Sequence, residues 1–273
     1  MRYIAHLAKT LSVTSINQYM SAIRLLSAEM GQANPLPSWP VRSLLQGIKR
    51  GKGNATKRKL PINPTLLLQI RRHLDLRKPA DQVLWAAFLT AFFTLLRRSN
   101  LLPSSANTFN ACLHPCRRDL RLLKRGFALI VKSTKTIQFS ERQLQLPIPC
   151  IPDHPLCPAS AIIAILCLKP ELPPCAPLFA YPTMHGMQVL TQHTFTQRLQ
   201  THLKRVGLEP SLYGTHSFRR GGASWAFRSG MPGEAVQILG DWRSDCYKRY
   251  LEIDMDTKFT LYDIFSNSLP SYS

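Results

Sequence analysis

The chain has 273 residues, a formal net charge of +20 and 45% hydrophobic residues. This length allows one large domain or one domain with a small companion, and the apolar content suffices for a sizeable core. The positive charge predicts a polyanionic partner, either a nucleic acid or an acidic membrane surface, rather than a merely soluble basic protein. The membrane surface is disfavoured, because no basic amphipathic helix with a bulky aromatic face is evident.

Membrane spans, secretion and metal sites are also disfavoured. The most apolar run, VLWAAFLTAFFTLL from Val83 to Leu96, is too short to cross a bilayer, and the N-terminus has no secretory pattern. The seven cysteines are odd in number and scattered, which favours free thiols in a reducing compartment. The segments CLHPC (112–116) and CIPDHPLC (150–157) lack the spacing of zinc fingers or ribbons, so no metal or other cofactor is expected.

In chain order, the first predicted helix begins near Ser15, which has capping-box spacing to Gln18, and ends at Gly31. A short helix is expected over Val41–Ile48. The segment Lys49–Pro64 is basic and has no hydrophobic periodicity, so we interpret it as a linker that contacts phosphates.

Beyond the linker, Asn63 and Pro64 predict the start of a helix that ends at Leu76, and a buried helix is expected over Asp81–Arg98. The β-rich runs GFALIVKSTKT and QLQLPIP predict an antiparallel hairpin. Five further helices are expected, over Pro158–Leu168, Thr191–Val206, Ser217–Arg228, Pro232–Leu239 and Ser244–Leu251. The predicted fold is mainly α with a small antiparallel sheet (α+β), divided into a helical domain (1–50), a basic linker (51–62) and a larger domain (63–273).

The segment THSFRRGGAS places His216 and Arg219 on one face of a predicted helix. The planar guanidinium of an arginine binds phosphate oxygens in bidentate fashion. Gly221 and Gly222 cost about 1 kcal/mol each relative to alanine inside a helix, which makes sense if another backbone or a ligand comes close. Taken alone, the pattern is better explained by a capping histidine and solvated arginines.

Other segments supply matching groups. Arg97 and Arg98 end the buried helix, Lys135 lies at the tip of the hairpin, and Tyr250 follows Trp242 on a short helix. Such a set can attack a phosphodiester without a metal, because fixed cations stabilise the charge that grows on the non-bridging oxygens and a lysine can protonate the leaving oxygen. The phenol, with an ordinary pKa near 10, needs a base or a positive field. The carboxylates are mostly isolated, which disfavours a two-metal site.

The chain resembles the tyrosine recombinases (phage-integrase family) in the order of five residues: Arg97, Lys135, His216, Arg219 and Tyr250. HSFRRGGAS is similar to the family's H-x-L-R-x-x-x-A box, and Tyr250 follows Gly240 by ten residues, as the family's tyrosine does. LLRRSNLL, STKTIQ and TSINQYMSAIRLL resemble the first-arginine box, the hairpin lysine segment and a helix of the DNA-clamping domain. The GDW and YKRYL segments are similar to recombinases of eukaryotic mobile elements of the DIRS and Crypton type.

The resemblance implies a partial SAM-like core-binding domain and a catalytic domain that recombines DNA without metal or ATP. Arg97 and Arg219 would clamp the scissile phosphate, His216 would accept or donate a proton, and Lys135 would protonate the leaving 5′ oxygen. Tyr250 would form a 3′-phosphotyrosyl link. The implied partners are double-stranded DNA and three further copies of the chain, in the nucleus of a eukaryote or otherwise in the cytoplasm.

Basic residues of the linker and the site are expected to contact DNA: Lys49, Arg50, Lys52, Lys57, Arg58, Lys59, Arg98 and Arg220. Two positions depart from the family's pattern. Asn100 stands where an acid usually supports the first arginine, and Asp241 stands at the second histidine or tryptophan position, with Trp242 shifted by one. Tyr247 is a competing nucleophile to Tyr250. The alternative functions are a catalytically inactive, domesticated DNA-binding protein and a type IB topoisomerase-like enzyme.

Overall fold

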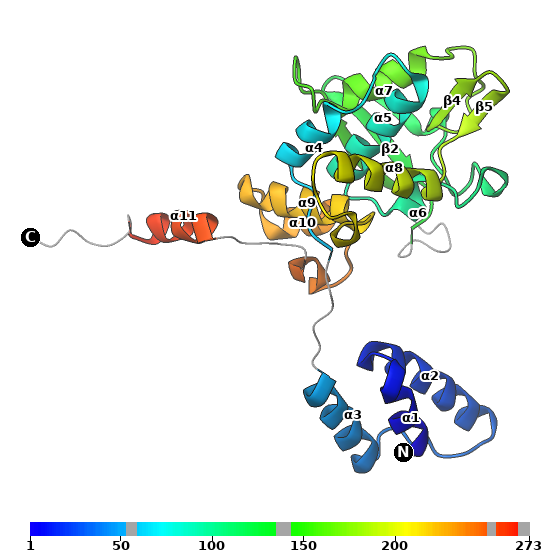
Figure 1. The fold of residues 1–273 in the computed structure, drawn as a ribbon, viewed down its shortest axis with the longest axis vertical. Helices are drawn as coiled ribbons and strands as arrows, with labels where there is room; N and C mark the ends of the chain where they lie inside the picture. Colours follow the sequence, from blue (N-terminus) through cyan, green and yellow to red (C-terminus); the bar gives the residue numbers. More distant parts are fainter. Residues whose placement is uncertain (53–58, 135–142, 250–254, 267–273) are drawn as a thin grey trace, which may run out of the picture. The chain divides into compact units, whose positions relative to one another are not determined.

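The computed structural model describes residues 1–52, 59–134, 143–249 and 255–266. The chain divides into two compact units, an N-terminal unit (Met1–Arg58) and a C-terminal unit (Lys59–Ser273) (Figure 1). Helices dominate, and the strands form small antiparallel sheets, which confirms the predicted fold class. No helix within the described ranges is long and apolar enough to cross a membrane.

The N-terminal unit consists of the helices α1 (Arg2–Thr10), α2 (Val13–Glu29) and α3 (Trp39–Lys52) (Figure 1). Its core is small. Four hydrophobic residues are buried, and a ring of partly buried side chains packs around them; the four are Ile4, Ile16, Met20 and Val41. They come from all three helices, so each helix places one apolar stripe against the other two.

Two expectations for this unit were wrong. The N-cap of α2 is Ser12 rather than Ser15, because the Ser12 side chain accepts a hydrogen bond from the Ser15 N–H at 3.2 Å. Helix α3 continues to Lys52, so Lys49, Arg50 and Lys52 lie in its last turn rather than in a linker. Cations there interact favourably with the negative end of the helix dipole, which stabilises the longer helix. Helix α1 was not predicted at all.

The C-terminal unit begins with α4 (Pro64–Arg71) and α5 (Pro79–Phe93). The predicted cap of α4 is confirmed, since the Asn63 side chain accepts a hydrogen bond from the Leu66 N–H at 2.8 Å. Helix α5 is apolar and buried on every face. It was expected to reach Arg98 but ends at Phe93, because Leu95 adopts a left-handed backbone conformation with φ of 55°.

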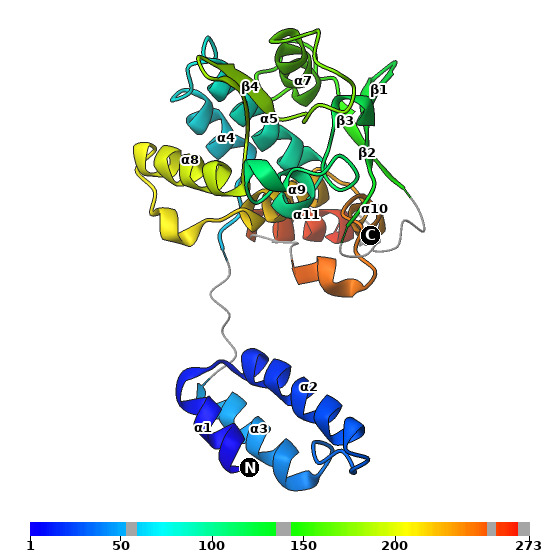
Figure 2. The ribbon, with the colours of Figure 1, turned by 90° about the vertical axis from the view of Figure 1, so that its right-hand side faces the viewer.

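A three-stranded antiparallel sheet follows, formed by β1 (Leu120–Leu123), β2 (Gly126–Val131) and β3 (Leu144–Pro149), with β2 in the middle (Figure 2). The pairing of β2 with β3 confirms the predicted hairpin. Its connecting segment, 135–142, contains Lys135 and lies outside the described residues. Strand β1 was not predicted, nor was the second hairpin of β4 (Ala180–Thr183) and β5 (Gly186–Val189).

The remaining elements are helical. The short helix α6 (Arg98–Leu101) follows α5, and α7 (Pro158–Cys167), α8 (Gln192–Arg205), α9 (His216–Arg228) and α10 (Gly233–Leu239) confirm four predicted helices. The helix expected over Ser244–Leu251 is instead a 3₁₀ turn, η4 (Asp245–Arg249). Other 3₁₀ turns are η1 (Ala106–Thr108), η2 (Arg117–Asp119) and η3 (Pro210–Leu212), and the last described helix is α11 (Met255–Ser266).

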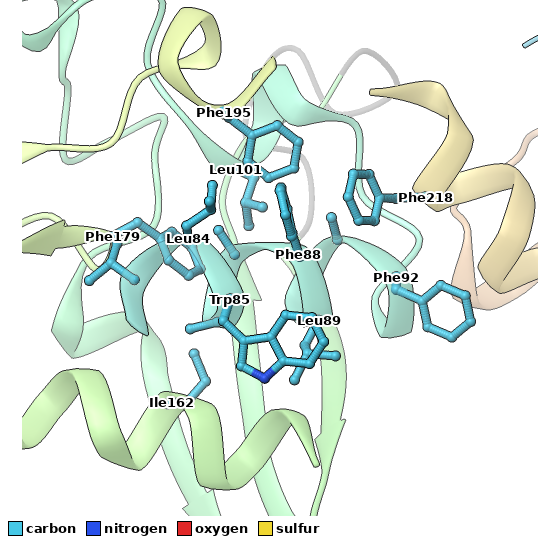
Figure 3. Close-up of a cluster of buried hydrophobic side chains, with 14 of the residues drawn as sticks. Leu84, Trp85, Phe88, Leu89, Phe92, Leu101, Ile162, Phe179, Phe195 and Phe218 are labelled. Carbon is cyan, nitrogen blue, oxygen red and sulfur yellow. The ribbon is translucent and has the colours of Figure 1, made fainter. Parts of the chain in front are cut away.

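Helix α5 forms the centre of the core, because α7, α9, β3 and β4 all pack against it. Phe88 of α5 lies 4.9 Å from Phe195 of α8 in an edge-to-face arrangement and 5.0 Å from Phe218 of α9, measured between ring centroids (Figure 3). These rings hold the first turn of α9 against α5, and that turn carries His216 and Arg219.

Candidate active site

Helix α9 approaches two other backbone segments very closely. A Cβ atom at Gly221 would lie 1.7 Å from the carbonyl oxygen of Ile62, and one at Gly222 would lie 2.1 Å from the carbonyl oxygen of Phe92. Both distances are far inside van der Waals contact, so only glycine fits at either position. The close approach predicted from the GG pair is therefore confirmed, and the approaching partner is protein backbone.

Arg219 is oriented by contacts to two backbone carbonyls and to Trp242. Its side chain is only 2% exposed, so its terminal N–H donors need acceptors within the protein. Nη1 donates to the carbonyl of Leu95, and Nη2 donates to the carbonyl of Gly240 at 2.6 Å. The ring of Trp242 lies against the guanidinium, 3.8 Å from ring centroid to Cζ. This stacked arrangement is a cation–π contact, which stabilises a desolvated arginine.

Both carbonyls that bind Arg219 are presented by unusual backbone. Leu95 has φ of 55°, and Asp241, directly after Gly240, has φ of 51°. A non-glycine residue in this region costs roughly 1–2 kcal/mol, although aspartate tolerates it better than leucine. Two left-handed residues thus turn the chain so that main-chain oxygens face one guanidinium, and such local strain is typical of functional sites.

The two departures from the family's pattern make structural contacts to the hairpin. The Asp241 carboxylate accepts a hydrogen bond from the Thr134 hydroxyl at 3.0 Å, and both side chains are buried. The Asn100 side-chain amide donates to the carbonyl of Ser133 at 3.0 Å. Ser133 and Thr134 directly precede Lys135 in the sequence. Asn100 and Asp241 therefore attach the end of the hairpin strand to the segments that hold Arg97 and Arg219.

The cations gather around His216, the first residue of α9. The pKa of His216 is lowered from its ordinary value, first by desolvation and then by the positive charges of Arg219, Arg97 and Arg98. Electrostatic interaction of this kind requires the three guanidinium groups to lie near the imidazole ring. Arg98 is further oriented by its hydrogen bond to the Thr196 hydroxyl at 2.8 Å. A neutral histidine within a positive cluster is suited to bind an anion and accept a proton.

No protein-family model matches the chain. Over 266 residues it is 24% identical to an integrase/recombinase XerD homologue of Selenomonas ruminantium, which covers 92% of this chain and 72% of the relative. Its structure is similar to the XerH site-specific recombinase bound to a palindromic difH substrate (TM-score 0.59, 13% identity, 97% of this chain and 68% of that chain). It is also similar to the Tn1549 transposon integrase in complex with circular intermediate DNA (TM-score 0.56, 14% identity, 96% and 82%). The chain has the fold of the tyrosine recombinases.

Within this tyrosine recombinase fold, the structure brings together Arg97, His216, Arg219 and Trp242, which the sequence analysis expected at one site. Two neighbouring residues compete for the second histidine or tryptophan position: Trp242 stacks on Arg219, and Asp241 accepts a hydrogen bond from Thr134. Lys135 and Tyr250 lie outside the described residues.

Tyr247, the competing nucleophile, is part of a second hydrophobic cluster. It is only 4% exposed, and its ring packs against Trp242 with 6.4 Å between ring centroids. The same cluster contains Leu95, Ala223 and Val236. Its ring is therefore packed against the residue that stacks on Arg219, and the side chain is almost fully buried.

Several residues expected to contact DNA make contacts within the protein. Lys59 donates from Nζ to the carbonyl of Ser211 at 2.5 Å, and Arg220 donates from Nη1 to the carbonyl of Lys59 at 2.8 Å. Lys52 donates to the carbonyl of Leu11 at 3.1 Å. Lys49 and Arg50 are exposed on α3, and Lys57 and Arg58 lie outside the described residues.

The residues that the sequence reasoning missed are those that act through main-chain atoms. Leu95 and Gly240 supply the acceptors for Arg219, and nothing in the sequence around Leu95 signals its left-handed turn. Gly240 has a packing requirement of its own, because a Cβ there would lie 1.7 Å from the Trp242 ring. In the described part of the chain, no three histidine, cysteine or acidic side chains are grouped as they would be around a metal ion.

Proposed function

We propose that this chain is a site-specific DNA recombinase that cleaves and rejoins DNA through a covalent tyrosine intermediate. The observation that carries the proposal is the cluster of Arg97, His216 and Arg219 in a chain with the tyrosine recombinase fold, in which backbone carbonyls and Trp242 orient Arg219. The charge of +20 and the DNA bound in both structurally similar recombinases support DNA as the partner.

The chemistry follows from the charges in the site. The Tyr250 oxygen attacks the scissile phosphorus, and the bond to the 5′ oxygen of the leaving strand breaks. Arg97 and Arg219 stabilise the negative charge that develops on the non-bridging oxygens. His216, whose pKa is lowered, is neutral at neutral pH and can assist in moving the phenolic proton. Lys135 donates a proton to the leaving oxygen, and attack by a free 5′ hydroxyl reverses each step.

The contacts of Arg219 with two carbonyls and Trp242 serve to fix the orientation of its guanidinium group. A buried guanidinium that is already oriented needs no reorganisation when charge develops on the phosphate. Trp242 shields it from water, and the carbonyls of Leu95 and Gly240 set its plane. The links from Asn100 and Asp241 to Ser133 and Thr134 would carry the same rigidity to the hairpin that bears Lys135.

Assembly is a further part of the proposal. Helix α11 exposes Met255, Phe259 and Tyr262, at 58%, 61% and 66% of their surfaces. Such an apolar strip suits docking on a neighbouring protomer in a homotetramer assembled on two DNA sites. Deletion of the residues after Asp256 should leave DNA binding intact and reduce synapsis, and unchanged recombination would contradict this part.

We further propose an origin in a mobile element of the DIRS or Crypton type and a nuclear location if the host is eukaryotic, or a cytoplasmic one otherwise.

A covalent-capture assay tests the activity. The full chain is incubated in EDTA with a pool of nicked duplexes that have a randomised core, and protease-sensitive, covalently shifted DNA is recovered and sequenced. We expect adducts from the native protein and complete loss with Tyr250→Phe, while DNA binding is retained. Tyr247→Phe is the matched control and should still form the adduct.

The assay also separates the alternatives. DNA binding without any adduct would overturn the recombinase proposal and favour a catalytically inactive descendant of such an enzyme. Adduct formation that relaxes supercoiled circles but never recombines two captured sites would instead indicate a topoisomerase-like activity. Loss of the adduct in Tyr247→Phe but not in Tyr250→Phe would show that the nucleophile has been misassigned.

A further inference from the structure

In the loop between β3 and α7, the sulfur of one cysteine contacts the backbone next to another cysteine. Cys150 directly follows β3, and Cys157 is the N-cap of α7. The Cys157 sulfur accepts hydrogen bonds from the N–H of Ile151 at 3.1 Å and from the N–H and hydroxyl of Ser160 at 3.4 and 3.1 Å. Because Ile151 is bonded to Cys150 in the chain, the first of these contacts brings the Cys157 sulfur against the backbone at Cys150.

The surroundings shift the pKa values of the two thiols in opposite directions. Burial alone would raise the pKa of the Cys157 thiol, but hydrogen bonds from the Ser160 side chain and from the backbone at Ile151, Ser160 and Ala159 outweigh it and lower that pKa. The pKa of Cys150 is raised by desolvation, then by the charge of Cys157 and by a hydrogen bond to it. Of the two thiols, Cys157 therefore loses its proton at the lower pH.

The other buried cysteine of the unit shows that burial alone does not create this arrangement. The pKa of Cys116 is raised, first by desolvation and then by the negative charge of Asp119, so this thiol keeps its proton. Access also favours the pair in the β3–α7 loop. Cys150 is exposed. Cys157 is only 3% exposed, but it lines a cavity of about 240 Å³ together with His154 and Ser160, which is large enough for a small oxidant.

We propose that Cys150 and Cys157 form a reversible oxidation site, at which peroxide converts the two thiols into an intramolecular disulfide. The Cys157 thiolate attacks one peroxide oxygen, the O–O bond breaks, and the released hydroxide takes a proton to become water. The Cys150 sulfur then attacks the sulfenic acid on Cys157, losing its proton, and the departing hydroxide becomes a second water. Two thiols lose two electrons in total, and one hydrogen peroxide is reduced to two waters.

The site is independent of the proposed recombinase activity but lies next to elements that serve it. Strand β3 is one arm of the hairpin whose connecting segment contains Lys135, and α7 packs against α5. A disulfide would join the end of β3 covalently to the first turn of α7. It would also remove the thiolate charge from the positive end of the α7 dipole.

Peptide mapping of the full chain tests the proposal. The reduced protein is treated with hydrogen peroxide, free thiols are alkylated, and the chain is cleaved at aspartate. Asp153 lies between the two cysteines, so a Cys150–Cys157 disulfide appears as two cross-linked peptides that dithiothreitol separates. We expect this cross-link to form before any loss of free Cys116.

Two variants make the result decisive. In Cys150→Ser the cross-link should be lost, and Cys157 should instead be trapped by dimedone as a sulfenic acid. Cys112→Ser, which removes an exposed cysteine elsewhere, should leave the cross-link unchanged. The proposal is overturned if peroxide yields no Cys150–Cys157 cross-link, if Cys157 pairs with another cysteine, or if Cys157 is oxidised no faster than Cys116.

Discussion

The two units of the chain differ in how they are stabilised. In the C-terminal unit a large core surrounds α5, and a second, smaller cluster lies beside it; the side chains of both are almost fully buried. In the N-terminal unit four hydrophobic residues are buried, whereas Trp39, Leu25 and Met30 are 75%, 62% and 61% exposed. A large core determines geometry through packing, while a small one depends more on local helix signals. The difference explains why the candidate site, which needs fixed side chains, is built on α5 and α9.

The largest expected effect is on the core beneath the site. Phe88→Ala removes a fully buried ring that contacts Phe195 and Phe218, and it should lower the free energy of unfolding by roughly 4 kcal/mol. Leu25→Ala, in the N-terminal unit, should change it by less than about 0.5 kcal/mol because the side chain is exposed. Calorimetry would measure both, and similar losses for the two variants would contradict the contrast between the units.

Acid should destabilise only the C-terminal unit. His202 is 1% exposed, neither of its ring nitrogens has a hydrogen-bond partner in the described part of the chain, and its pKa is lowered from 6.5 to about 4. Desolvation is the main cause, followed by the charges of Arg198 and Arg205; Asp81 acts in the opposite direction and His73 lowers the pKa slightly.

The unfolded state therefore binds a proton at a higher pH than the folded state does. Above a pH of about 6.5, His202 is neutral in both states and does not reduce the free energy of unfolding. As the pH falls from about 6.5 to about 4, the unfolded state takes up a proton that the folded state does not, and the free energy of unfolding falls by roughly 3 kcal/mol in total. His202→Phe should flatten this part of the pH profile, measured by denaturant titration. The only histidine of the N-terminal unit, His6, is exposed, so hydrogen exchange there should not follow the same curve. An unchanged profile in His202→Phe would assign the acid sensitivity to other groups.

A glycine-to-alanine substitution should lower the stability of one unit and raise the stability of the other. Gly221→Ala forces a Cβ into the carbonyl of Ile62 and should destabilise the C-terminal unit by about 1–3 kcal/mol. Gly47 lies within α3, and a Cβ at this position would have no neighbouring atom within 4 Å, so Gly47→Ala should stabilise the N-terminal unit by about 1 kcal/mol. Thermal unfolding followed by hydrogen exchange separates the units, and a loss of stability in Gly47→Ala would show that α3 has an unseen neighbour.

The sequence predicted those features that depend on local signals. Asn63 with Pro64 marked the start of α4, the glycine pair marked the close approach of α9, and the β-rich runs marked the pairing of β2 with β3. The two short strands β4 and β5 were missed because four residues each carry too little periodicity.

In the candidate site, too, the sequence predicted the features that have a local signal and missed those that have none. The motifs pointed to Arg97, His216, Arg219 and Trp242, which the structure gathers. The acceptors that orient Arg219 are main-chain oxygens, and a backbone carbonyl has no signature in a sequence. The end of α5 was misplaced for a related reason, since the left-handed conformation of Leu95 is imposed by tertiary contacts against the intrinsic preference of leucine.

The smallest effect expected is at the start of α2, where the sequence favoured the wrong serine. The Ser12 side chain accepts the Ser15 N–H, so Ser12→Ala should lower the stability of the N-terminal unit by about 1 kcal/mol. Ser15→Ala keeps that N–H and places a better helix former in the first turn, so it should be neutral or slightly stabilising. Hydrogen exchange of α2 peptides would measure the difference. Because the described residues of the N-terminal unit include four buried hydrophobic side chains, a single cap represents a larger share of its stability than a cap of the C-terminal unit does. Equal effects of the two serine variants would place the start of α2 back at Ser15.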